Sequence, residues 1–191
     1  MAEYFPPQGV GRGAHLPNIQ ATYIDLHRLL AIFLASKEFA DRIDAPQRHN
    51  AELRDPLFIL QECEEDEISR ILLSLAVTAR AVDDAHNQIL ELVAGVCGTL
   101  IRDMTTPDVT IALELREACN KIIHADHWHF DLETNEQGRS YLTPTMYIYG
   151  RSQGGRNWKA ILDVVEFAKQ YVNNVALVRN AARGLCPLPG Y

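Results

Sequence analysis

Residues 106–129 read TPDVTIALELREACNKIIHADHWH and decide the fold, because a helical pattern ends within them and a strand pattern begins. Thr106, Pro107 and Asp108 are typical of a helix start, since proline is tolerated in the first turn. Apolar residues at helical spacing then predict a helix that runs to about His124. Beyond it the chain becomes rich in aromatic and β-branched side chains, which favour strands.

Helices are also predicted on the N-terminal side of this stretch. Residues 18–43 carry a broad apolar face with no Gly or Pro inside it. A second helix should run from Asp55 to about residue 84, with Asp55 as the N-cap and a proline in the first turn. The apolar segment 86–104 is interpreted as a helix, although two glycines lie inside it.

Three short strands are predicted on the C-terminal side. They are the runs HWHFDLE, TMYIYG and NWKAILDV, and the glycines between Gly150 and Arg156 form the second turn. A final helix should begin near Asp163 and end at Gly184. The expected fold is therefore mainly α, a helical bundle with a small antiparallel β-hairpin or three-stranded insert at about 126–163.

Length and charge bound the organisation of the chain. Its 191 residues suit one domain. We expect residues 1–17 to be a flexible arm, 18–184 a single helical domain and 185–191 a C-terminal tail. The formal net charge of −7 argues against a protein whose whole surface coats nucleic acid. The acidic run from Glu62 to Glu67 indicates a solvated helix start, with a partner-binding patch as the alternative.

The sequence also predicts a compartment. The N-terminus has no apolar core of a secretory signal, and no segment approaches the roughly 18 consecutive apolar residues of a membrane helix. The four cysteines have no spacing typical of a zinc finger or ribbon. We therefore expect reduced thiols, a cytoplasmic location and no membrane partner.

Three polar side chains share one face of the helix expected over residues 107–124. Arg116, Asn120 and His124 stand at positions i, i+4 and i+8, on a row that contains apolar residues and lies opposite the core stripe. Such groups are costly on a buried face unless they are hydrogen-bonded or line a cleft. One interpretation is a structural network in which Arg116 pairs with an acid. The other is a cleft at a two-fold homodimer interface.

The segment LREACNKIIHA, residues 115–125, resembles the signature helix of HEPN-domain proteins. Those are small helical-bundle proteins, commonly dimeric, and many are metal-independent endoribonucleases of toxin–antitoxin and phage-defence systems. Their motif is an Arg followed, after four to six residues, by a His. Asn120 and His124 match its second half. The nearest arginine here is Arg116, seven residues before the histidine, and Cys119 occupies one of the positions expected for it.

The resemblance implies RNA cleavage without a metal or other cofactor. His124 would move protons, Arg116 would stabilise charge on the phosphate and Asn120 would orient the reacting groups. The RNA 2′-hydroxyl would attack, leaving a cyclic phosphate and a 5′-hydroxyl. The implied partners are RNA, a second copy joined through helix 107–124, and an antitoxin or other partner protein. A non-catalytic dimerisation and interaction module of the same ancestry is the alternative.

A metal-dependent hydrolase is a third alternative. The run HADHWH contains side chains that zinc accepts as ligands, and a metal-bound water can hydrolyse phosphodiesters. The candidate ligands are His124, Asp126, His127 and His129. His127 and His129 are predicted to share one strand face, with Trp128 on the other, and a solvated or cross-strand pair is the alternative to a metal site.

Basic and aromatic side chains of the C-terminal part are the candidates for contact with RNA, either with phosphates or by stacking on bases. The candidates are Lys121, Arg151, Arg156 and Trp128. Three further aromatic residues could stack on bases or fill the interface between strands and helices, namely Tyr147, Tyr149 and Trp158.

Overall fold

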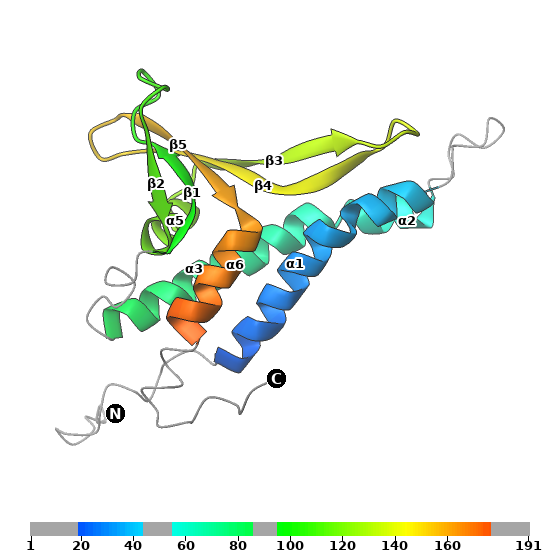
Figure 1. The fold of residues 1–191 in the computed structure, drawn as a ribbon, viewed down its shortest axis with the longest axis horizontal. Coiled ribbons are helices and arrows are strands. Elements are labelled where there is room, and N and C mark those ends of the chain that lie inside the picture. The colour runs from blue at the N-terminus through cyan, green and yellow to red at the C-terminus, as the bar shows by residue number, and fades with distance from the viewer. Residues whose placement is uncertain (1–18, 44–54, 86–94, 177–191) are drawn as a thin grey trace, which may run out of the picture.

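The computed structural model describes residues 19–43, 55–85 and 95–176. These residues form an α/β fold with a five-stranded antiparallel sheet and a layer of helices on one of its faces (Figure 1). The predicted mainly α helical bundle with a small insert is therefore wrong. The predicted arm 1–17, the tail 185–191 and the helix end at Gly184 lie outside the described residues.

The helices begin and end as follows: α1 (Ile19–Arg42), α2 (Pro56–Gln61), α3 (Glu64–Ala85), α5 (Leu115–Ile123), α6 (Val164–Tyr171) and the π-helix η2 (Val172–Ala176). The strands are β1 (Val96–Ile101), β2 (Thr110–Glu114), β3 (His127–Thr134), β4 (Ser140–Arg151) and β5 (Asn157–Asp163).

The N-terminal helices lie close to their predicted places. Asp55 is the N-cap of α2, and its carboxylate accepts the N–H of Leu57 at 2.7 Å. The predicted second helix is divided into α2 and α3, because the chain turns at Glu62 and Cys63. There the N–H of Cys63 bonds to the carbonyl of Leu60, three residues earlier, which tightens the last turn of α2.

The sheet has the strand order β2-β1-β5-β4-β3, and every neighbouring pair is antiparallel. The three predicted strands are confirmed as β3, β4 and β5. The helices predicted over 86–104 and 106–124 are wrong where strands β1 and β2 replace them, and residues 86–94 lie outside the described part. In β1, a Cβ added to Gly98 would lie 2.0 Å from the Ile161 carbonyl oxygen, so the close approach of β5 requires glycine there.

One hydrophobic core fills the space between the helices and the inner face of the sheet. The sheet contributes alternate residues that are fully buried, among them Met146, Ile148 and Leu162. Leu29 of α1 and Leu72 of α3 are fully buried in the same cluster. The opposite face of the sheet is therefore left to polar and aromatic side chains.

A buried hydroxyl links three elements that are distant in sequence. The Ser36 hydroxyl of α1 accepts the N–H of Leu142 in β4 and donates to the Glu64 carboxylate of α3, both at 3.0 Å. Burial raises the pKa of Glu64, and the hydrogen bond from Ser36 opposes that shift. This hydroxyl therefore holds the end of β4 against both long helices.

Among the described residues, none of the helices combines the length and apolar character needed to cross a membrane.

Candidate nucleic-acid interface

The predicted catalytic arginine has a structural partner. Arg116 lies in the first turn of α5, and its Nε donates to Asp83 Oδ2 of α3 at 2.8 Å. The Asp83 side chain is fully buried, and Arg80 also approaches its Oδ2, at 3.4 Å. This geometry agrees with the interpretation in which Arg116 pairs with an acid, because a buried carboxylate needs a cationic partner.

The other two members of the row have separate surroundings. Asn120 Nδ2 donates to Glu117 Oε2 at 3.3 Å, within α5 itself. His124 is the exposed C-cap of that helix. Arg116 borders an open concavity of about 390 Å³ together with Arg102 and Glu117, and His124 is not among its lining residues. Within the described part of the chain, Arg116 and Asn120 therefore each have an acidic partner, and His124 is not among the residues that line the concavity beside Arg116.

The helix proposed for dimerisation is also shorter than expected. Residues 110–114 of the predicted helix 107–124 form strand β2. Leu113, on the face expected to meet a second copy, is fully buried in the core of its own chain. Leu113 is therefore covered within its own chain, whereas Val109 of the same row is 64% exposed, and dimerisation stays a prediction.

The histidine cluster lies at the start of β3. As predicted, His127 and His129 share one face of the strand, with ring centroids 5.4 Å apart, and Trp128 packs against the core on the other. The His127 ring stacks on Tyr149 of β4, with centroids 4.9 Å apart and planes 4° from parallel. In the described part of the chain, no three His, Cys, Asp or Glu side chains are grouped to hold a metal ion.

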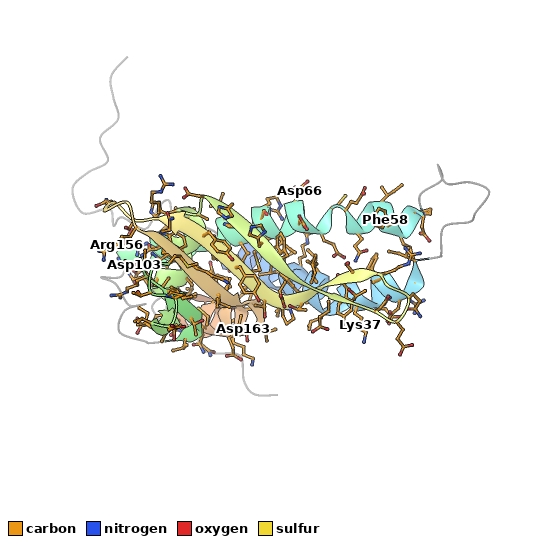
Figure 2. The ribbon with its side chains drawn as sticks, turned by 90° about the horizontal axis from the view of Figure 1, so that it is seen from above. Lys37, Phe58, Asp66, Asp103, Arg156 and Asp163 are labelled. Atoms are coloured by element: carbon orange, nitrogen blue, oxygen red, sulfur yellow. The ribbon has the colours of Figure 1, made fainter. Side chains whose placement is uncertain are left out.

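The strand register places aromatic and basic side chains together on the outer face of the sheet. Tyr149 is opposite His127 on one side and Lys159 on the other, and Tyr147 is opposite His129. The Lys159 Nζ lies 4.4 Å from the centroid of Tyr147 and 5.5 Å from that of Tyr149. Seen from above, this face lies in front of the helices, which pack against the opposite side (Figure 2).

The outer face ends in a concavity of about 630 Å³ near the β4–β5 turn. Its lining includes the stacked pair His127 and Tyr149, together with Arg151 and Asn157. Arg151 is exposed, as is Arg156 on the turn itself (Figure 2). This end of the sheet therefore combines aromatic rings with cationic side chains.

A buried tryptophan underlies this end of the sheet. A Cβ on Gly150 would lie 2.2 Å from the Trp158 ring, so the glycine leaves room for that ring on the inner face. Trp158 is only 3% exposed. Lys121 of α5, a predicted RNA contact, covers it with Nζ 4.3 Å from the ring and pairs with Glu117 at 3.1 Å. Lys121 and Trp158 therefore serve packing, whereas Arg151 and Arg156 remain at the surface.

The carboxylate of Asp131 orients the hydroxyl end of the aromatic row. It accepts hydrogen bonds from the Tyr147 hydroxyl at 3.2 Å and the Thr143 hydroxyl at 2.7 Å. Desolvation and the Asp131 charge raise the pKa of Tyr147 above its ordinary value. The hydroxyl is thereby held toward β3.

Lys159 is the member of this surface that the sequence interpretation missed. A signal was present, because Tyr147, Tyr149 and Arg151 alternate along one strand and Lys159 follows a short glycine turn. Counting back across that turn pairs Lys159 with Tyr149, as observed.

Comparison of the chain with protein-family models, with curated proteins and with solved structures finds no match.

Proposed function

We propose that the protein binds single-stranded RNA on the outer face of its sheet. The observation that carries this proposal is the row of His127, Tyr149 and Lys159, with Tyr147 beside it. Single-strand binders combine aromatic rings, on which bases stack, with a cationic groove that follows the phosphates. Stacking is sequence-tolerant because every base has a π-face, so the proposal implies weak sequence preference.

The charge distribution supports a local site and not a fully basic surface. The chain as a whole is acidic, so attraction of RNA depends on a few cations near the aromatic row. The candidate phosphate contacts are Lys159 on β5, Arg151 at the end of β4, and Arg156 on the turn between these strands. Three phosphate contacts to a single strand predict a log–log salt slope of about −2. The proposal includes a cytoplasmic location.

The test is fluorescence anisotropy with labelled RNA oligomers of about 12 nucleotides, which fits the site sizes of single-strand binders. Tyr149→Ala should weaken binding about tenfold to hundredfold, because a base–aromatic stack contributes about 1–3 kcal/mol. Lys159→Ala should make the salt slope shallower by about 0.7. The matched control is Tyr141→Ala on the same strand, whose hydroxyl bonds to Glu133 near the β3–β4 turn, and it should retain affinity.

Two results would overturn the proposal. One is wild-type protein that binds none of the four homopolymeric RNAs, and the other is a Tyr149→Ala variant that is folded and binds like wild type. The sequence also predicts metal-independent RNA cleavage that is lost in His124→Ala. Incubation of the same RNA with the protein in chelator, followed by a denaturing gel, tests that prediction.

A further inference from the structure

An open groove runs between α3 and the first half of β3, and His127 lies at its border with the aromatic row. It encloses about 480 Å³. Leu73 of α3 and Ile123, at the end of α5, contribute apolar side chains, and Trp128 and Phe130 of β3 contribute aromatic ones. Leu73 is 46% exposed, and the two aromatic rings are only partly buried. The groove therefore exposes apolar and aromatic surface of a kind that partner proteins commonly cover.

Carboxylates form the rim of the same groove. Glu65 and Asp66 line it from the first turn of α3, and Asp126 lines it from the start of β3. All three are exposed, and α3 with Asp66 is visible beside the edge of the sheet (Figure 2). Within the described residues these three carboxylates form no ion pair. Their charge is therefore available to a cationic partner.

The strand beside the groove is the end strand of the sheet. β3 has β4 as its one neighbour among the described strands. The outer edge of such a strand can pair with an extended peptide through backbone hydrogen bonds. A register irregularity between Phe130 and Leu132 interrupts the ladder, and the acids Asp131 and Glu133 follow. Irregular and charged edges resist strand addition, which leaves residues 127–130, beside the groove, as the part of the edge open to pairing.

We propose that this edge binds an extended segment of another protein that carries apolar residues at every second position and Lys or Arg at its ends. Side chains alternate along a strand, so a segment paired with β3 would direct every second side chain toward the groove. Apolar side chains there would cover Trp128 and Phe130, and flanking cations would meet Glu65 and Asp66.

Charge favours a foreign segment over a second copy of this chain. β3 itself contains no Lys or Arg, whereas it contains Asp131 and Glu133. Pairing of two β3 edges would therefore place the acidic β3 of one copy beside the acidic rim of the other copy's groove. Like charges across an interface lower affinity. The groove shares His127 with the aromatic row, but most of its lining lies on the inner side of β3 and in the helix layer, so the variants that test this proposal are chosen outside that row.

The test measures anisotropy of a fluorescein-labelled synthetic peptide in which Leu or Val stands at every second position between lysines at the two ends. Its controls are a peptide of the same composition with its lysines in the centre, and an alternating peptide N-methylated along both backbone edges. The wild-type chain should bind the alternating peptide at least about tenfold more tightly than either control. Charge reversal in Glu65→Lys/Asp66→Lys should weaken it by a similar factor.

A matched reversal of two exposed acids away from the groove, Asp108→Lys/Glu136→Lys, should leave peptide affinity unchanged at equal net charge. If the wild-type chain bound the N-methylated peptide as tightly as the unmodified one, strand addition would be overturned. If both charge-reversed variants lost the same peptide affinity, the effect would come from net charge and not from the groove. Failure of the wild-type chain to bind the alternating peptide would overturn the proposal outright. So would sedimentation showing a dimer that Glu65→Lys/Asp66→Lys dissociates, because a second copy would then occupy the groove.

Discussion

Replacement of Arg116 by Ala should destabilise the protein by about 2–3 kcal/mol. Removing one partner of a buried ion pair typically costs about 3–5 kcal/mol, because the remaining charge keeps its desolvation penalty. Two observations lower that figure here. Arg80 remains 3.4 Å from the same oxygen of Asp83, and the Arg116 side chain is 22% exposed, so water partly replaces it.

The assay is urea unfolding at neutral pH, followed by far-UV circular dichroism. A double-mutant cycle with Asp83→Asn isolates the pair, and Arg116→Ala should cost less than about 1 kcal/mol in that background. A variant within about 0.5 kcal/mol of wild type would refute the structural role of Arg116. Such a variant that had also lost RNA cleavage would return Arg116 to the catalytic role implied by residues 115–125.

Two further substitutions test contacts of the sheet with the helices, and a third tests the approach of β5 to β1. Ser36→Ala should cost about 1–3 kcal/mol in urea unfolding, because it leaves the buried N–H of Leu142 without its acceptor. Glu64→Gln should gain stability relative to wild type as the pH rises from about 4 to 7 in thermal melts, because the raised pKa of Glu64 means that the folded state disfavours its charged form. Gly98→Ala should cost more than about 3 kcal/mol or prevent folding, since its Cβ would collide with the Ile161 carbonyl oxygen.

Each of these variants has a matched control at an exposed site. Ser74→Ala on α3, Glu65→Gln beside Glu64, and Gly154→Ala in the β4–β5 turn should each change stability by less than about 0.5 kcal/mol. Wild-type stability of Ser36→Ala or of Gly98→Ala would contradict the hydrogen bond to Leu142 or the close approach of Ile161, respectively. A stability difference between Glu64→Gln and wild type that does not change with pH would contradict the raised pKa of Glu64.

The sequence predicted the elements whose periodicity is long and uninterrupted. The helices α1 and α3 and the strands β3 to β5 belong to this group. β1 and β2 were missed because VCGTLI and TIALE are short apolar runs, which periodicity alone does not assign. The TTPD segment, interpreted as a helix start, forms the turn between them. There Asp103 accepts hydrogen bonds from the N–H of Thr105 at 2.9 Å and from its hydroxyl at 2.7 Å, which lower the pKa of Asp103. Asp and Thr are common both in turns and at helix starts, so these residue types do not distinguish the two structures.

The candidate site was predicted only in part, for a related reason. Sequence spacing placed Arg116 and His124 on one helix face, but the partner of Arg116 comes from Asp83, in another helix. Tyr147 and Tyr149 were recognised as residues that could stack on bases. Their position on an open face could not be assigned until the side of the sheet covered by helices was known, because strand residues alternate between two faces.

The order of the strands has a consequence for how the chain reaches its native state. The sheet consists of a β1–β2 hairpin and a β3–β4–β5 meander, and the β1–β5 pair joins them, with β2, α5, β3 and β4 between its two strands in sequence. Pairing across such a long segment is slow, because the loop must close before the contacts form. During synthesis at about 5–20 residues per second, β1 leaves the ribosome several seconds before β5. For that interval the inner edge of the hairpin is unpaired, so VCGTLI is a segment at which a chaperone that binds extended apolar chain would meet this protein.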